Sequence, residues 1–301
     1  MSKLLVIFGA TGQQGGSVIN CVINDLELSK MYKVRGVTRD PSKATAKALE
    51  QKGVEIVKGD LDDTESLKQA LYGAHTIFAP TRTNYNDKTK EIVQGKTLGD
   101  MAVAAGVQYF IFSTLPDVSN NSGNKYKHCY MFDCKAIVEH YIRSLPIKSA
   151  FFAPGAFMSN FSNRMTLHPT GDGSYTMSFT VAPQTEIPLL DVAADTGKYV
   201  CTILAEPAKY EGKVLSAATR LYSFDEIARI ISKLSGKTVT YKQLPTSTFR
   251  VADHAEMLFY FQEFGYYGVN TKEKVEWTAR NARGELTTFE EYIAKNPPKF
   301  V

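Results

Sequence analysis

The sequence lacks the features that mark membrane, secreted, metal-binding and nucleic-acid-binding proteins. No apolar run in its 301 residues reaches the roughly 20 residues that a membrane-spanning helix needs, and the run at 4–8 is too short for a signal peptide. The four cysteines form no C-x-x-C pair, and the five histidines show no metal-ligand spacing. The formal net charge of +4 is mild, whereas a nucleic-acid-binding protein is expected to have a basic stripe or a much higher charge. We therefore expect a soluble protein of the cytoplasm, the nucleus or both, with no metal, no membrane contact and no direct nucleic-acid partner.

The start of the chain holds the most informative pattern. The apolar run at 4–8 is typical of a strand that is buried on both faces. It leads directly into a G-x-x-G-x-x-G pattern at Gly9, Gly12 and Gly15, and then into apolar residues at helical spacing. Such glycines let a pyrophosphate approach the backbone, and the helix offers it unpaired N–H groups and a positive dipole end. The pattern indicates a dinucleotide site; the alternative is an ordinary turn between a strand and a helix.

The next 150 residues alternate between strand-like and helix-like segments. Further strands are predicted at 32–37, 54–57, 76–79, 109–112 and 148–152, and helices at 42–51, 63–71, 91–105 and 131–144. This alternation predicts a doubly wound parallel sheet of the Rossmann type in residues 1–153, in the α/β class. Ligands of such sheets bind beyond the carboxyl ends of the strands, where the strand order reverses.

From about Pro154 the pattern becomes irregular. Strands are predicted at 187–190, 214–217 and 238–244, an aromatic-rich helix at 248–264, and further helices after the capping-box patterns that begin at Ser223 and Thr288. We predict a smaller α+β C-terminal lobe, residues 154–301, interleaved with the sheet edge and holding a substrate or a partner. The aromatic residues at 259–267 are predicted to be mainly lobe core, with a partner-binding surface as the alternative.

The end of the second strand indicates the choice of cofactor. NAD-selective sites usually place an acidic residue here, on the ribose 2′-OH. This chain has Arg39, followed by Asp40 and Lys43, and a guanidinium suits a 2′-phosphate. The pattern favours NADP(H) over NAD(H); the alternatives are an Arg39 that is solvated or paired with Asp40. Asp60, after the third strand, either accepts a hydrogen bond from the adenine amine or caps the next helix.

The catalytic residues of short-chain dehydrogenases are only partly present. Those enzymes carry a Ser at the end of the fifth strand and Tyr-x-x-x-Lys on the next helix, where the Lys lowers the pKa of the phenol that transfers a proton. Ser113 and Lys135 stand at the Ser and Lys positions, but Met131 stands at the Tyr position and cannot donate a proton. Tyr130 is adjacent to that position, but neighbouring side chains on a helix point about 100° apart, so Tyr130 is not expected to take the place of the missing Tyr. His128 is either a substitute acid or a solvated loop residue.

Six strings together resemble the NmrA-like family of atypical short-chain dehydrogenases, over nearly the whole chain. They are GATGQQGGS, GVTRDPSK, GDLDD, FDCKAIVEHY, APGAFMSNF and PLLDVAADTG. The resemblance implies a Rossmann domain with a small C-terminal lobe, NADP(H) binding and the absence of the catalytic Tyr, often with His in its place; Met131 departs from that His. It implies either a redox-sensing regulator that binds partner proteins or, as in quinone reductases and isoflavone-reductase-like relatives, an NAD(P)H-dependent oxidoreductase.

The resemblance also implies a binding role for matching positions along the dinucleotide. The phosphate cradle would comprise Gly9, Thr11, Gly12, Gln14 and Gly15, with Arg39 and Lys43 on the 2′-phosphate. The adenine would lie beside Asp60 and Leu61, and the ribose side would be lined by Ala79, Pro80 and Thr81. The nicotinamide end would contact Ser113 and Lys135 and would be walled by Pro154, Gly155, Ala156 and Phe157, although Phe157 also fits a place in the lobe core.

Two functions follow, and the sequence favours the first. The first is an NADP(H)-binding regulator of transcription or signalling without strong catalysis, because the dinucleotide site is intact and the proton donor is missing. The second is a reductase of quinones, enals or similar small carbonyl compounds, in which water, Lys135 or His128 supplies the proton. Loss of a general acid typically slows a reaction about a hundred- to ten-thousandfold without abolishing it.

Overall fold

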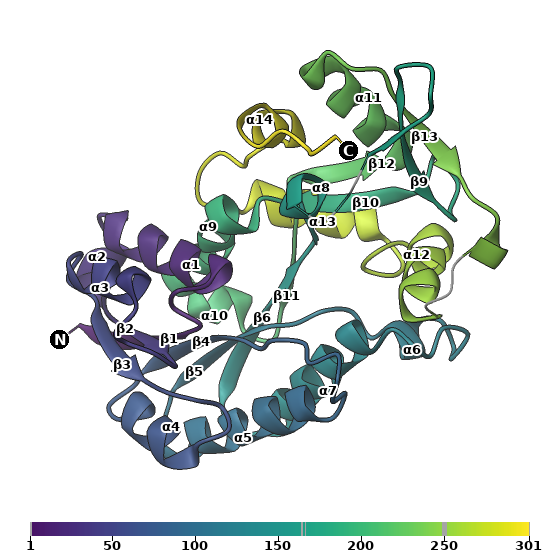
Figure 1. Ribbon diagram of the computed structural model, residues 1–301. Coiled ribbons are helices and arrows are strands. Elements are labelled where there is room, and N and C mark those ends of the chain that lie inside the picture. The colour runs from purple at the N-terminus through teal and green to yellow at the C-terminus, as the bar shows by residue number, and fades with distance from the viewer. Residues whose placement is uncertain (1, 164, 166, 249–251, 301) are drawn as a thin grey trace. The chain divides into compact units, whose positions relative to one another are not determined.

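The computed structural model describes residues 2–163, 165, 167–248 and 252–300, and the chain divides into two compact units (Figure 1). The first unit comprises Met1–Leu115, Met131–Ala153 and Ala193–Leu215. The second comprises Pro116–Tyr130, Pro154–Val192 and Ser216–Val301. The division into domains at 153/154 stays a prediction about which segments fold on their own. Within the described ranges, no helix has both the length and the apolar character needed to span a bilayer.

The first unit is built on a seven-stranded sheet with the order β11-β6-β5-β4-β1-β2-β3. Pairing is parallel from β6 through to β3. The strand order reverses next to β1, which lies between β2 and β4, and this is the topological switch point at which such sheets bind ligands. The strands are β1 Lys3–Phe8, β2 Tyr32–Thr38, β3 Glu55–Lys58, β4 Thr76–Pro80, β5 Tyr109–Ser113, β6 Lys148–Pro154 and β11 Val214–Ala217. The predicted Rossmann sheet is confirmed.

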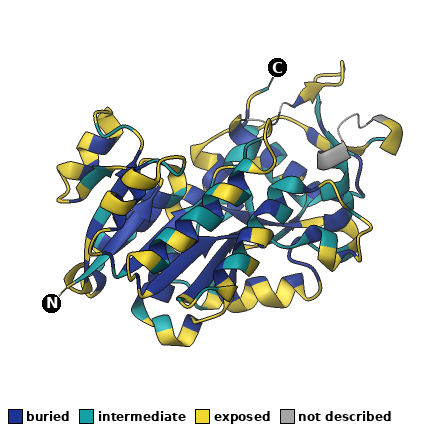
Figure 2. Cartoon of the chain, turned by 90° about the horizontal axis from the view of Figure 1, so that it is seen from below, coloured by how far each residue is buried: buried dark blue, intermediate teal, exposed yellow. Residues whose placement is uncertain are grey.

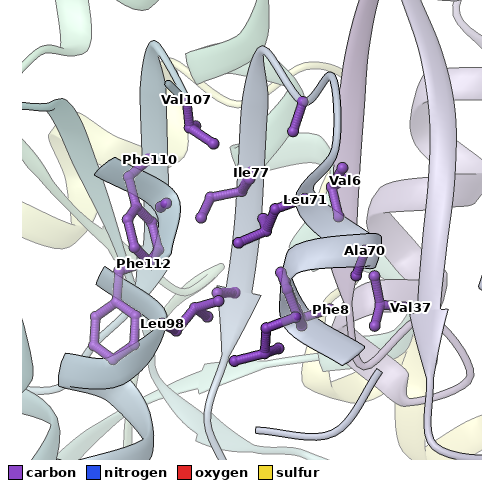
Figure 3. Close-up of a cluster of buried hydrophobic side chains, with 14 of the residues drawn as sticks. Val6, Phe8, Val37, Ala70, Leu71, Ile77, Leu98, Val107, Phe110 and Phe112 are labelled. Atoms are coloured by element: carbon purple, nitrogen blue, oxygen red, sulfur yellow. The ribbon is translucent and has the colours of Figure 1, made fainter. Parts of the chain in front are cut away.

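Alternation of side chains along the strands gives this sheet two apolar faces. Val6 and Phe8 of β1 join a core with Ile77 of β4 and with Phe110 and Phe112 of β5 (Figure 3). Three helices cover this face. They add the following residues to the same core: Leu67, Ala70 and Leu71 of α4, Leu98 and Ala102 of α5, and Val138 and Ile142 of α7. In Figure 2 the central strands of the sheet are mainly dark blue, whereas the covering helices expose one side. Burial on both faces explains the continuous apolar runs in the sequence.

The helices of the first unit follow the strands closely. They are α1 Gln13–Asn24, α2 Leu28–Met31, α3 Ala44–Glu50, α4 Thr64–Leu71, α5 Lys90–Ala104, α7 Tyr130–Ser144, α9 Val192–Ala205 and α10 Pro207–Tyr210. Helix α9 lies against α1 at Gly197, whose N–H donates to the Ser17 hydroxyl at 2.9 Å. A Cβ at position 197 would lie 2.3 Å from the Ser17 carbonyl oxygen, so the close approach of the two helices requires glycine there.

The second unit contains two small sheets and a set of helices. The sheets have the orders β12-β10-β7 and β13-β9-β8. The strands are β7 Ala156–Phe157, β8 His168–Pro169, β9 Tyr175–Phe179, β10 Glu186–Leu190, β12 Arg220–Ser223 and β13 Val239–Gln243. The helices are α6 Val118–Asn121, α8 Ser159–Asn163, α11 Phe224–Ser235, the 3₁₀ turn Thr246–Thr248, α12 Ala252–Phe264, α13 Thr271–Arg280 and α14 Phe289–Lys295. The α+β character predicted for this part of the chain is present.

Of the two capping boxes predicted for the second unit, the one at Thr288 forms completely and the one at Ser223 forms in part. Thr288 and Glu291 form both bonds of a capping box at the start of α14. At the start of α11 the Ser223 hydroxyl accepts from the Glu226 N–H, but the Glu226 carboxylate pairs with Arg220 at 2.8 Å. The predicted helix at 248–264 begins, among the described residues, at Ala252; positions 249–251 lie outside them.

Candidate functional site

The turn between β1 and α1 has the geometry that the glycine pattern predicted. Gly9 has φ +63°, a conformation that favours glycine, and its carbonyl accepts from the Gly12 N–H at 2.8 Å. A Cβ on Gly15 would lie 2.3 Å from the Gly9 carbonyl oxygen and 3.0 Å from that of Phe8. Gly15 therefore lets α1 begin directly against the end of β1.

The start of α1 is left open to a ligand. Gly12 occupies the N-cap position and has no side chain to bond the first-turn N–H groups, and the first turn contains no acidic residue. The Gln14 side-chain oxygen is buried and has no hydrogen-bond partner within the described part of the chain. An uncapped helix start beside an unsatisfied buried acceptor is an arrangement that an anionic ligand with hydrogen-bond donors would satisfy.

A cleft of about 850 Å³ opens at the carboxyl ends of β1 to β4. This volume lies within the range of roughly 300–1,000 Å³ that small-molecule sites occupy. Most of the residues predicted to bind the dinucleotide line it: Gly9, Thr11, Gly12, Gln14, Gly15, Arg39, Lys43, Asp60, Leu61, Pro80 and Thr81. Ala79, Ser113 and Lys135 do not line it, since Ala79 and Ser113 are buried within their strands and Lys135 lies behind Thr81.

The basic residues at the end of β2 are exposed. Arg39 forms neither a hydrogen bond nor an ion pair with any residue that the structure describes, and its guanidinium lines the cleft together with Lys43. The alternative pairing of Arg39 with Asp40 is not found. The Asp40 carboxylate instead accepts from the N–H and the hydroxyl of Ser42, at 3.0 and 2.5 Å, and these bonds lower the pKa of Asp40.

The loop after β3 contains two carboxylates with different functions. Asp63 caps α4 by accepting from the N–H groups of Glu65 and Ser66. The alternative that Asp60 caps this helix is therefore wrong; Asp60 accepts from the Asp62 N–H at 3.1 Å and lines the cleft.

Asp62 connects the loop after β3 to the start of α5. Its carboxylate binds the Lys90 ammonium and the Gln94 side-chain amide, each at 2.7 Å, and these two partners lower the pKa of Asp62. All three residues line the cleft, so this bridge forms part of its wall on the β3 side.

Lys135 is held by protein groups at the other side of the cleft. Its ammonium donates to the Thr81 carbonyl oxygen at 3.0 Å, to the Thr81 hydroxyl at 3.1 Å and to the Glu91 carboxylate. The Thr81 hydroxyl donates to the same Glu91 oxygen at 2.6 Å, and Glu91 is only 1% exposed. An ammonium has three donors, so none is left for a ligand in this arrangement. Contact of Lys135 and Ser113 with the nicotinamide end stays a prediction.

His128, the alternative proton donor on the loop, has a hydrogen-bond partner of its own, and so do Tyr126 and Cys134, which are close to it in the sequence. In the second unit, the Tyr126 phenol donates to Glu263 at 2.8 Å, and burial together with this bond raises the pKa of Tyr126 to about 12. The His128 ring bonds the Glu256 carboxylate at 2.5 Å. In the first unit, the Cys134 thiol donates to the Lys88 carbonyl oxygen at 3.2 Å, and burial raises the pKa of Cys134 to about 11. The Tyr126 phenol and the Cys134 thiol are therefore protonated and neutral at pH 7.

The segment after β4 was not predicted to belong to the site. It supplies five consecutive residues to the cleft wall, and the missed residues include Arg82, Thr83, Asn84, Tyr85 and Asn86 from this segment and Asp62, Lys90 and Gln94 from the bridge. The rule that ligands bind beyond the carboxyl ends of the strands would have found the polar string RTNYN, because it directly follows a predicted strand. Glu91 was also missed, because a single acidic residue in a helix gives no sign that it is buried.

The residues predicted to wall the nicotinamide face belong to the second unit. Gly155 donates its N–H to the Ala217 carbonyl oxygen at 2.8 Å, and a Cβ there would lie 2.7 Å from the carbonyl oxygen of Pro188. Ala156 and Phe157 form β7, which pairs with β10, and both are half-buried. The role of Pro154, Gly155, Ala156 and Phe157 toward a cofactor stays a prediction.

Solved structures with the same fold include regulators and reductases. A crystal structure of NmrA, described as a negative transcriptional regulator, in complex with NAD has a TM-score of 0.80, 23% identity, and coverage of 98% of this chain and 95% of that chain. The triphenylmethane reductase of Citrobacter sp., complexed with NADP(H), has a TM-score of 0.76, 21% identity, and coverage of 98% and 100%. At these identities the likeness shows the fold.

Sequence comparison identifies the family. An NmrA-like family domain-containing protein from Dictyostelium discoideum is 29% identical over 308 residues, which covers 98% of each chain. The model of the NmrA-like family matches residues 1–293. With that match over nearly its full length, the chain belongs to the NmrA-like family.

Proposed function

We propose that this protein binds NADP(H) in the cleft at the carboxyl ends of β1 to β4 and works as a redox-sensing regulator of transcription or signalling. The observation that carries the proposal is a complete phosphate cradle beside an incomplete proton relay. The cradle consists of the Gly9 to Gly15 turn, the uncapped start of α1 and the unsatisfied Gln14 oxygen. The relay has Met131 in place of Tyr, and its Lys135 is bound to Glu91 and Thr81.

The charges at the end of β2 support NADP(H) as the preferred dinucleotide. Arg39 and Lys43 line the cleft, and Asp40 is turned to Ser42 rather than to Arg39. A guanidinium without a protein partner gains most from a phosphate, whereas the ribose hydroxyl of NAD offers it no charge. Solved NmrA structures contain either NAD or NADP, so both dinucleotides belong in the test.

The second candidate is an NAD(P)H-dependent oxidoreductase acting on quinones, enals or similar small carbonyl compounds. Its support is the likeness in fold to triphenylmethane reductase, which was solved with NADP(H). The reduced cofactor would supply a hydride, and the proton would come from water, Lys135 or His128. Among these, Lys135 and His128 are each bonded to a carboxylate, which favours water as the donor.

Calorimetric titration with NADPH, NADP⁺, NADH and NAD⁺ tests the proposed function, followed by NADPH consumption with a panel of quinones and enals. We expect tight binding of the phosphorylated pair, an affinity that depends on the redox state, and no consumption above the buffer rate. Consumption well above that rate would establish the oxidoreductase. Failure to bind any of the four dinucleotides would contradict the assignment of the cleft.

A further inference from the structure

Glu91 is a buried carboxylate whose contacts lie beside the proposed dinucleotide cleft. Only 1% of its side chain is exposed, and it pairs with the ammonium of Lys135, whose side chain is 12% exposed. Both bond Thr81, which lines the cleft. Glu91 lies on α5 and Lys135 on α7, so Thr81 is held at the end of β4 by two different helices.

The pair carries no net charge, although each member alone would be an uncompensated buried ion. A buried ion whose partner is removed is costly, because the low-dielectric surroundings screen it poorly. Arg39, Lys43 and Arg82 also line the cleft, but they are exposed and therefore screened by water. Lys135 is thus a largely buried cation beside the cleft whose charge is compensated by one buried carboxylate, Glu91.

The strand order places this pair on the nicotinamide side. β4 flanks β1 on the side opposite β2, and Arg39 and Lys43 follow β2. A dinucleotide whose pyrophosphate lies at the Gly9 to Gly15 turn and whose 2′-phosphate lies at Arg39 must extend its other half over β4 and β5. Thr81, at the end of β4, lies under that half.

We propose that Glu91 is a positioning residue that sets the preference of this protein between the oxidised and the reduced dinucleotide, by neutralising Lys135. The inference rests on the proposed binding of NADP(H). The nicotinamide ring carries one positive charge when oxidised and none when reduced, so a nearby uncompensated ammonium weakens binding of the oxidised form alone. Glu91 removes that penalty by compensating the charge of Lys135.

The test is the ratio of the dissociation constants of NADP⁺ and NADPH, measured by calorimetry at pH 7. Glu91→Gln keeps the shape of the side chain but removes the carboxylate, so the Lys135 ammonium loses its compensating charge. We expect this variant to weaken NADP⁺ relative to NADPH by about three- to tenfold. Lys135→Met leaves the Glu91 carboxylate unpaired and is expected to shift the ratio by a similar factor in favour of NADP⁺.

A double variant and a matched control complete the design. Glu91→Gln combined with Lys135→Met removes both charges and is expected to return the ratio to within about twofold of the wild type. Because a buried ion pair can be replaced without loss of stability, the double variant can also be measured where a single variant does not fold. Asp100→Asn removes a carboxylate from α5 that accepts from the Tyr141 phenol of α7 at 2.6 Å, away from the cleft, and is expected to leave the ratio unchanged.

The outcomes separate this proposal from the proposed function. Equal weakening of both forms by Glu91→Gln and Lys135→Met would mean that the pair only supports the wall of the cleft, and would overturn the proposal. A change of the same sign in both single variants would overturn it as well. Absence of dinucleotide binding in the wild type would instead refute the proposed function.

Discussion

The two sides of the cleft use basic residues in opposite ways. On the β2 side, Arg39 and Lys43 are exposed, and Arg39 has no hydrogen bond or ion pair within the described residues. On the β4 side, all three donors of Lys135 are bound by Thr81 and Glu91. A cation without a protein partner is available to a ligand, whereas a saturated one supports the protein. The comparison teaches that a lysine at the catalytic position of the sequence can be bound entirely by protein groups.

The glycine turn lies between the two sides, and its loss should have the largest effect. Gly15→Ala places a Cβ 2.3 Å from the Gly9 carbonyl oxygen, so α1 must move away from β1. We expect a loss of about 1–3 kcal/mol in the free energy of unfolding, typical of overpacking, and a decrease in NADPH affinity of at least a hundredfold. Denaturant unfolding and calorimetry measure the two effects.

Gly16→Ala is the matched control for that substitution. A Cβ on Gly16 would have its nearest contact at 3.5 Å, from the Ala10 carbonyl oxygen, which is an ordinary van der Waals distance. Because alanine favours helices over glycine by roughly 1 kcal/mol, this variant should be as stable as the wild type or more so. Equal behaviour of the two variants would contradict a specific role for Gly15.

The β2 side is tested by Arg39→Gln. Loss of a charge-assisted bond to a phosphate is typically worth about 1.5–3 kcal/mol, so NADPH affinity should fall about ten- to a hundredfold. NADH affinity should change by less than about threefold, because NADH has no 2′-phosphate. Lys33→Gln, on β2 but away from the cleft, serves as the control. A parallel loss for both cofactors would show that Arg39 does not select between them.

The sequence predicted most of the sheet and the β1 and β2 part of the site, because these depend on local patterns. Strands buried on both faces produce apolar runs, and the Gly9, Gly12 and Gly15 spacing is a property of one short segment. The residues at strand ends, such as Arg39 and Asp60, could then be placed by a single topological rule.

Two of the missed features, the burial of Glu91 and the bridge at Asp62, depend on contacts between distant segments. Glu91 and Lys135 are 44 positions apart, and Asp62 and Gln94 are 32 apart. Burial of Glu91 follows from the packing of α5 and α7 beside β4, which no periodicity in the sequence shows. His128 was weighed as an acid from its place in the chain, but its carboxylate partner, Glu256, lies on α12.

The β4 side is tested by restoring the missing phenol with Met131→Tyr. Positions 131 and 135 lie one helical turn apart on α7, so the new phenol shares a face with Lys135. Because Lys135 is occupied by Glu91 and Thr81, it cannot lower the pKa of that phenol. We expect reduction of enals and quinones to stay within about threefold of the wild-type rate, well short of the hundredfold that a general acid supplies.

A matched pair of variants sharpens that expectation. Met131→Tyr combined with Glu91→Gln releases one donor of Lys135, and any gain in rate should appear in this combination first. NADPH binding and the thermal midpoint serve as controls for correct folding. A gain of tenfold or more from Met131→Tyr alone would show that the bonds to Glu91 and Thr81 do not restrain Lys135.

The smallest effect is expected at the bridge between Asp62 and α5. Hydrogen bonds from Lys90 and Gln94 lower the pKa of Asp62, so the folded state binds that proton more weakly than the unfolded chain does. The resulting stabilisation is complete above the unfolded pKa of about 3.9 and is lost as the pH falls through the lower, folded pKa. Since both partners of the ion pair are largely exposed, Asp62→Asn should lower the thermal midpoint at pH 7 by about 2 °C or less. The difference between variant and wild type should shrink below pH 4, and a difference that persisted unchanged at pH 2 would place its origin in packing instead of charge.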